Sequence, residues 1–253
     1  MFKAEVRRVV FNWLESRGYD MQDPLLPYQR RSRAAFFAAE RAARQRYTEL
    51  PATVKADLPA RLEAKYRDTA VLGTVSVYDA LGELAHIIDP LDPYLGAVSQ
   101  LTHQLQMASL MEDDGVEETL ILCGLVHDLG KLLIKFGDED PINVEAAGKK
   151  VPLEGELGGG LFGCTFRWDH GDFAYLRLKD YAAPEVAWVV RHHSLDLPAC
   201  EPYMNDQDRA YAERYLKPFM YYDERKDIYA LPKKGLEDYR SLIDRAFPGK
   251  IVI

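Results

Sequence analysis

A histidine and an aspartate stand side by side directly after the longest uncharged apolar run of the chain, Leu120 to Val126. This pair, His127 and Asp128, lies within LILCGLVHDLGKLLIKFG, where apolar residues flank it on both sides. A buried carboxylate without a partner costs several kcal/mol. A metal ion removes that cost, because imidazole nitrogen and carboxylate oxygen both bind first-row divalent cations. A carboxylate has two oxygens, so Asp128 can bridge two ions where His127 binds one.

Two further residues extend the pair to the pattern H…HD…D. His103 lies in LTHQLQMASLM before the pair, and Asp223 lies in FMYYDERKD after it. The order of these residues resembles the HD metal-dependent superfamily. A His-Asp dipeptide alone is weak support for such a site. A buried pair that is followed by Leu-Gly-Lys, preceded by a helical histidine and followed by a late aspartate is a specific signal.

Two more histidines lie between the pair and the last aspartate. His170 is in FRWDHGDFAYL and His193 is in VVRHHSL, each with apolar neighbours at helical spacing. For either one alone, a histidine packed in the core is an equally good interpretation. Together with the first four residues they make four histidines and two aspartates, which is enough to hold two metal ions. We expect His86 to have a packing or surface role and His192 to have a structural or supporting role.

The elements that must position these residues are almost all helices. Apolar residues recur at spacings of three and four, while convincing strands are absent. The pattern predicts helices over 2–16, 28–46, 52–66, 77–88, 94–112, 117–136, 168–182, 184–194, 206–216 and 235–247. Residues 137–164 are richer in Gly and Pro and predict a loop beside the site, with room for a short hairpin. We therefore expect an all-α fold, with a helical arm over 1–70 packed on a core over 71–253.

Composition excludes several classes of protein. The chain has 253 residues and a net charge of −8, with a pI near 5.3. This acidic balance argues against nucleic-acid and anionic-membrane partners, which favour a basic face. Three cysteines are too few for a disulfide framework, and no signal-peptide pattern opens the chain, so a cytoplasmic protein is expected. The oligomeric state and the partner of the arginine-rich segment 30–46 stay open.

The chain resembles the myo-inositol oxygenase family, a branch of the HD superfamily, over residues 76–250. Eight segments carry the likeness. They are DPLDP (89–93), HQLQMA (103–108), GLVHDLGKLLIKFG (124–137), RWDHGDFAYL (167–176), RHHSL (191–195), MNDQD (204–208), YYDERKD (221–227) and YRSLIDRAFPGKI (239–251). The closing phrase LID-x-x-x-PG is specific to this family within the superfamily. No motif can be placed in the first seventy residues.

The resemblance implies a non-haem di-iron oxygenase with an HD-domain bundle. Its cofactors would be two iron ions in the Fe(II)/Fe(III) state, with O2 as co-substrate for a four-electron cleavage of a C–C bond in a cyclic polyol, of the type myo-inositol to glucuronate. Asp128 and Lys131 would act in catalysis, and Asp89, Lys131 and Ser194 would contact the substrate. The implied iron ligands, with Asp128 bridging, are His103, His127, Asp128, His170, His193 and Asp223.

Departures from the family pattern leave the substrate open. The loop between Asp128 and His170 is shorter than in the animal inositol oxygenases, and Gly148-Lys149 stands where those enzymes present Gly-Asp. A lysine at that place adds Lys149 to the predicted substrate contacts and suits an anionic substrate, as in phosphonate-cleaving relatives. Lys226 follows the last aspartate by three positions where four are expected, so its role as a substrate contact is open.

Two other functions fit the same metal pattern. An HD phosphohydrolase would use it to activate a metal-bound water against a phosphate ester, with Lys131 and Lys149 serving the phosphate. The phrase at 239–251 has no explanation in that case. A metal-binding sensor without turnover is the third hypothesis, but all six ligand positions are filled, which gives it no positive support.

Overall fold

The computed structural model describes residues 45, 52–87, 89, 99–137, 144, 149–225 and 232–253. The predicted helix 2–16 and the predicted basic helix 28–46, apart from residue 45, lie outside these residues. None of the described helices is both long and apolar enough to cross a membrane.

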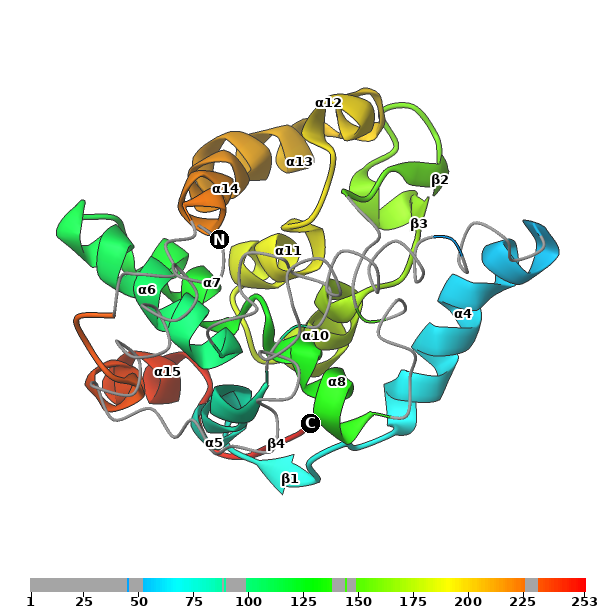
Figure 1. Cartoon of the computed structure of the whole chain (residues 1–253). Helices are drawn as coiled ribbons and strands as arrows, with labels where there is room; N and C mark the ends of the chain where they lie inside the picture. Colours follow the sequence, from blue (N-terminus) through cyan, green and yellow to red (C-terminus); the bar gives the residue numbers. More distant parts are fainter. Residues whose placement is uncertain are drawn as a thin grey trace, which may run out of the picture.

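The described chain is built from helices, with two small pairs of strands, so the predicted all-α class is confirmed (Figure 1). The α-helices are α4 (Ala52–Asp68), α5 (Val77–Glu83), α6 (Gln100–Asp113), α7 (Glu118–Val126), α8 (Leu133–Phe136), α10 (His170–Leu178), α11 (Pro184–His192), α12 (Leu197–Cys200), α13 (Asp206–Tyr211), α14 (Lys217–Glu224) and α15 (Arg240–Ala246). The strands are β1 (Thr74–Val75), β2 (Pro152–Glu154), β3 (Thr165–Phe166) and β4 (Ile251–Val252), paired β1 with β4 and β2 with β3, both antiparallel.

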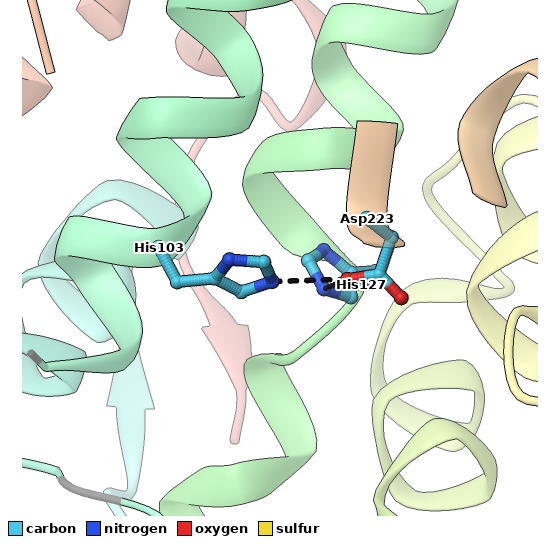
Figure 2. A group of neighbouring side chains, drawn as sticks. All are labelled: His103, His127 and Asp223. Atoms are coloured by element: carbon cyan, nitrogen blue, oxygen red, sulfur yellow. Dashed lines mark hydrogen bonds and ion pairs between the residues drawn. The ribbon is translucent and has the colours of Figure 1, made fainter. Parts of the chain in front are cut away.

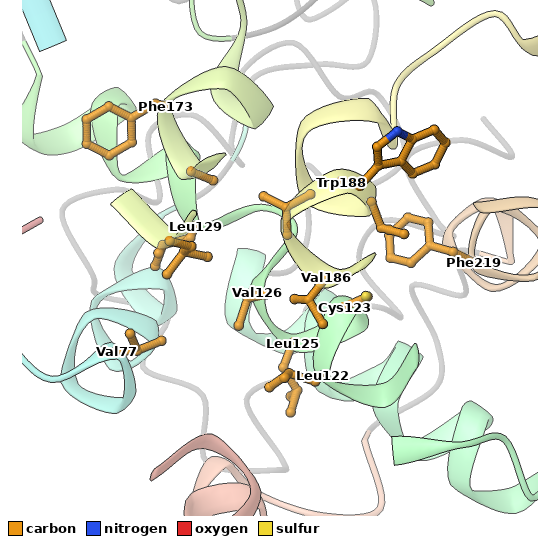
Figure 3. Packing of buried hydrophobic residues seen from close by; sticks show 14 of the residues in the cluster. Val77, Leu122, Cys123, Leu125, Val126, Leu129, Phe173, Val186, Trp188 and Phe219 are labelled. Carbon is orange, nitrogen blue, oxygen red and sulfur yellow. The ribbon is translucent and has the colours of Figure 1, made fainter. Parts of the chain in front are cut away.

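The centre of the core is the hairpin of α6 and α7, on which α11 and α14 pack, while α10 packs on α11 and on the 3-10 turn Leu129–Leu132. Gly124 allows the hairpin to close tightly, because a Cβ added there would lie 3.3 Å from Met111 Sδ and 3.7 Å from Met107 Cβ. Side chains of α5, α7, α10, α11 and α14 meet in one apolar cluster (Figure 3). Phe173, Trp188 and Phe219 are among its largest fully buried members. Helices that carry candidate ligands are therefore held by a common core.

The predicted helix over 117–136 is broken at the His-Asp pair. Helix α7 ends at Val126, Asp128 has φ −91° and ψ 12°, and a 3-10 turn, Leu129–Leu132, leads into α8. The start of α10 crosses the chain at this point, so close that a Cβ on Gly130 would lie 1.9 Å from the carbonyl oxygen of His170. The prediction of one continuous helix was wrong. The spacing of apolar residues in 117–136 carries no information about another helix that packs against the middle of this segment.

Other boundaries differ for local reasons. Helix α10 begins at His170 rather than at 168, because the Asp169 side chain caps it by accepting from the amides of Gly171 and Asp172. The predicted helix 206–216 continues through a π-helical turn, Ala212–Leu216, into α14, which carries Asp223. Strand β2 lies within the predicted loop 137–164, and it pairs with β3, which directly follows that loop.

Helix α4, the described end of the predicted arm, packs on the core. Leu58, Leu62 and Tyr66 belong to the same apolar cluster as the other helices. Tyr66 stacks on Trp168 with ring centroids 5.4 Å apart, and the Arg177 guanidinium of α10 donates to the Tyr66 carbonyl. The division of the chain at residue 70 stays a prediction.

Replacement of Gly130 by alanine tests the close approach of α10. We expect Gly130→Ala to lower the free energy of unfolding by about 1–3 kcal/mol or more, because the backbone of His170 cannot yield to a methyl group. Gly82→Ala is the matched control: a Cβ there meets nothing within 4 Å, and a helix-interior alanine adds roughly 0.5–1 kcal/mol. Urea unfolding of both variants measures the difference, and equal stability of Gly130→Ala and the unmodified chain would contradict the packing.

Candidate metal centre

The structure brings the six predicted ligands together as two groups of three. His103, His127 and Asp223 form one group, and Asp128, His170 and His193 form the other. Within each group, one ligand atom per residue lies within 4.8 Å of the others. Five of the six side chains are buried, and Asp223 is the half-buried exception.

The first group joins three helices. His103 comes from the first half of α6, His127 follows α7, and Asp223 lies in the last turn of α14. The three side chains point toward one another (Figure 2). Asp223 Oδ1 lies 3.0 Å from His103 Nε2 and 3.8 Å from His127 Nε2. The Asp223 side chain is 22% exposed, so this group is the one that solvent reaches.

The second group is built from helix ends. His170 is the first residue of α10, and His193 directly follows α11. Their Nε2 atoms lie 2.9 Å apart. Asp128 Oδ1 lies 3.1 Å from Nε2 of His170 and 3.8 Å from Nε2 of His193.

Asp128 faces both groups, one with each oxygen. Its Oδ2 lies 3.3 Å from His127 Nε2, while its Oδ1 is directed to His170 and His193. Burial alone would raise the pKa of Asp128, but His127 and Lys131 together hold it well below its usual range. The carboxylate is therefore ionised at neutral pH, with one oxygen directed to each group.

Hydrogen bonds to the backbone orient three of the four histidines. The Nδ1 atoms lie 3.0, 2.9 and 2.8 Å from carbonyl oxygens for His127, His170 and His193, respectively. Because a carbonyl only accepts, each Nδ1 carries the proton, and we infer that each Nε2 presents its lone pair to the centre. Burial, with nearby His170, lowers the pKa of His193 to about 3, so this ring is neutral.

This donor set fits divalent cations. The Nε2 atoms of His170 and His193 lie 2.9 Å apart, so one positive ion can contact both. Imidazole nitrogens and carboxylate oxygens are the ligand types that iron and other first-row metals accept. Among the described residues each group supplies three candidate ligands, and Asp128 Oδ2 offers a fourth to the first group, which leaves coordination positions for small molecules.

Lys131 stands beside the second group as a buried cation. Its Nζ lies 3.0 Å from Asp89 Oδ2 and 3.3 Å from Asp128 Oδ2. The 3-10 turn after Asp128 brings it back over that carboxylate. The structure thus places two predicted substrate contacts, Asp89 and Lys131, next to the bridging position.

The other two predicted contacts have different surroundings. The Ser194 hydroxyl donates to Asp169 Oδ2 at 2.8 Å. The Lys149 side chain is half exposed, and its ammonium lies 2.9 Å from Glu224 Oε1. Gly148 and Lys226 lie outside the described residues.

Sequence reasoning missed a buried ion-pair network behind the second group. Lys150, rather than its neighbour Lys149, is the buried lysine, and it bonds to Asp169 and Asp172. These two carboxylates raise the pKa of Lys150 although burial opposes them, so it is charged. The spacing D-H-G-D, typical of a capping box, could have identified Asp169, but nothing in Lys149-Lys150 tells which lysine turns inward.

The two remaining histidines lie apart from the ligand groups. His86 ends a short 3-10 turn and is exposed. His192 is buried against Trp188 and Phe162, and its Nδ1 lies 2.9 Å from the Trp188 carbonyl oxygen. Burial lowers its pKa well below the usual range.

Comparisons with known proteins agree on one family. The family model of myo-inositol oxygenase matches residues 40–153. The match begins within the first seventy residues, where no motif could be placed from the sequence. A probable inositol oxygenase of Oryza sativa subsp. japonica is 28% identical over 221 residues, covering 70% of each chain. Inositol oxygenase 1 of Arabidopsis thaliana is 28% identical over 218 residues, covering 70% of this chain and 69% of its own. The resemblance seen in the sequence is confirmed: the chain is similar to the myo-inositol oxygenase family.

Proposed function

We propose that this chain is a non-haem di-iron oxygenase that uses O2 to cleave a ring C–C bond of a cyclic polyol such as myo-inositol. The observation that carries the proposal is Asp128, whose two oxygens face two separate three-ligand groups. Similarity to the inositol oxygenase family supports the oxygenase class.

The residues that would hold the metals follow from the two groups. His103, His127 and Asp223 would bind one iron, His170 and His193 the other, and Asp128 both. When bound, two irons would supply the electron transfer and the oxygen binding that this class of oxidation needs.

Lys131 is the proposed catalytic group of the chain itself. Its ammonium is buried and already within 3.3 Å of Asp128. A fixed cation at this place can donate to a substrate hydroxyl and favour its deprotonated form, because charge stabilisation is strong where water is excluded. The proton of the hydroxyl that lies against Lys131 would pass to the Asp89 carboxylate, which lies 3.0 Å from the ammonium.

Asp89 and Ser194 are proposed to orient the substrate. The Asp89 carboxylate, fully buried beside Lys131, can accept from a hydroxyl. The Ser194 hydroxyl would keep donating to Asp169 while its own lone pairs accept from a substrate hydroxyl.

The polyol is favoured over an anionic substrate for an electrostatic reason. Lys149 suggested an anionic substrate, but its ammonium is matched by Glu224, and to reach a substrate it must leave that carboxylate. Lys131 is likewise matched by Asp89 and Asp128. Lys149 remains a proposed contact, while the charges around the centre suit a neutral, hydroxyl-rich molecule.

The phosphohydrolase hypothesis uses the same ligands and is not favoured. The relatives found are inositol oxygenases, and their class accounts for the phrase at 239–251. A phosphohydrolase, unlike an oxygenase, would turn over its substrate in the absence of oxygen.

Oxygen uptake tests the proposed function directly. We expect the full chain, loaded anaerobically with Fe(II), to consume O2 with myo-inositol or a stereoisomer, and to give the EPR signal of a coupled Fe(II)/Fe(III) pair on partial oxidation. Phosphorylated inositols and hydroxyphosphonates form the comparison panel in the oxygen electrode. Two results would contradict the oxygenase proposal. One is release of phosphate from a nucleotide panel under nitrogen, and the other is full activity with one zinc and no iron.

Asp128→Asn tests the bridge. A neutral amide lacks the negative charge with which a carboxylate bridges two cations, so we expect loss of bound iron. Turnover should fall by more than about 100-fold, because removal of a hydrogen-bond partner of a metal ligand already costs about 10- to 100-fold. His192→Gln, next to a ligand but packed against Trp188, is the control and should keep its iron. Metal analysis and EPR provide the readout; an Asp128→Asn protein with two irons and activity would remove the bridging assignment.

Lys131→Ala separates substrate handling from metal binding. Iron content should stay unchanged, while kcat/KM falls by about 100- to 1,000-fold, the usual effect of losing one donor to a developing oxyanion. Lys135→Ala, an exposed lysine one turn further on, is the matched control. Steady-state oxygen uptake at several polyol concentrations measures both; equal kcat/KM in the two variants would exclude the role of Lys131.

A further inference from the structure

Lys150 carries a buried ammonium group that joins two segments of the metal centre. Its side chain is only 2% exposed, and Nζ lies 2.9 Å from Asp169 Oδ1 and 2.8 Å from Asp172 Oδ2. Asp172 Oδ1 binds the Nε of Arg191 at 3.1 Å. The two carboxylates and the two cations are thus matched, and each charge has a direct partner.

The hydrogen bonds around Lys150 include the sequence neighbours of His170 and His193, the two histidines of the second group. Asp169 directly precedes His170, and Ser194 directly follows His193. The hydroxyl of Ser194 donates to Asp169 Oδ2 at 2.8 Å, so the two segments are bonded to each other. A shift of either segment would therefore displace the histidine beside it.

Lys150 also holds the His193 segment by its main chain. Its amide donates to the Ser194 carbonyl at 2.8 Å, and its carbonyl accepts from the Asp196 amide at 2.9 Å. One residue thus binds the segment after His193 through its backbone and the segment before His170 through its ammonium. It is a cross-link between the two ligand-bearing segments.

The ammonium is not needed to complete the cap of α10. Asp169 Oδ1 already accepts from the amides of Gly171 at 3.0 Å and Asp172 at 3.3 Å. The main-chain bonds of Lys150 are likewise formed without its side chain. What the ammonium adds is a fixed distance between the two segments, and with it the placement of the His170 and His193 Nε2 atoms.

We propose that Lys150, through Asp169 and Ser194, is a positioning residue that fixes His170 and His193 for the second metal ion. The inference rests on the proposed function insofar as that function places an iron in this group. The first group, His103, His127 and Asp223, has no bond to Lys150 among the contacts described, so its metal should be unaffected.

Lys150→Met and Lys149→Met are the test pair. They remove the same charge from adjacent positions, one buried between carboxylates and one exposed beside Glu224. Full-length protein is reconstituted anaerobically over a range of Fe(II) concentrations, and iron per chain, the EPR signal of the coupled pair and the melting temperature of the metal-free protein are measured. Lys150→Met should bind the first iron normally and the second about 10- to 100-fold more weakly, with loss of the coupled signal. Lys149→Met should match the unmodified chain in all three measurements.

A double variant keeps the test decisive if Lys150→Met fails to fold. Lys150→Met with Asp169→Asn removes both charges of the pair, keeps an oxygen to cap α10 and leaves Asp172 with Arg191. A folded double variant with a weakened second iron supports the proposal. Unchanged affinity for both irons in either folded variant overturns it.

The outcomes also separate this inference from the proposed function. Two irons in the unmodified chain without oxygen uptake on any polyol would overturn the function, and the positioning role would still be decided by the second-iron affinity. Oxygen uptake on a polyol together with unchanged iron affinity in Lys150→Met would overturn the positioning role alone. A single iron in the unmodified chain would overturn both.

Discussion

The centre of this molecule depends on one carboxylate shared between two sets of histidines. Asp128 is buried in the core, which is tolerable only because His127, His170 and Lys131 approach its oxygens. Each of these groups belongs to a different part of the surrounding chain: the end of α7, the start of α10 and the 3-10 turn at Leu129–Leu132. The packing of those elements against one another therefore determines the geometry around the carboxylate. A core of tightly joined helices is the structural means by which six polar side chains are kept close together.

Most of the proposed ligands lie at helix ends rather than on helix faces. His127, His170, His193 and Asp223 all lie at or within a turn of an end. A residue at such a place can be oriented by backbone carbonyls of its own last turn, as His127 and His193 are by Gly124 and Val190. This arrangement fixes the tautomer before any metal arrives, which reduces the reorganisation that binding requires. Binding of a metal should accordingly stabilise the fold as a whole.

Sequence reasoning predicted the helical class and the six residues that the structure gathers, because helical periodicity and residue type are local properties. It failed where the decisive contact is between distant segments. The break at Asp128 comes from α10 lying against Gly130, and nothing within 117–136 signals it. Lys149 and Lys150 are chemically identical neighbours, and only Asp169 and Asp172, about twenty positions on, decide which is buried. The roles of the six residues as ligands and of Asp89, Lys131, Lys149 and Ser194 as substrate contacts remain predictions.

The π-helical turn at Ala212–Leu216 has a consequence for how this chain can vary in length. A wide turn of this kind accommodates one residue more than an α-helix needs over the same rise. Loss of a single residue there would restore regular helix and leave α14 in phase with the rest of the bundle. Between this turn and Asp223 no such slack exists, and a change of one residue would rotate the carboxylate by about 100° around the helix axis, away from His103 and His127. A deletion of one residue is thus tolerated within Ala212–Leu216, whereas an insertion or deletion between Leu216 and Asp223 would displace the carboxylate.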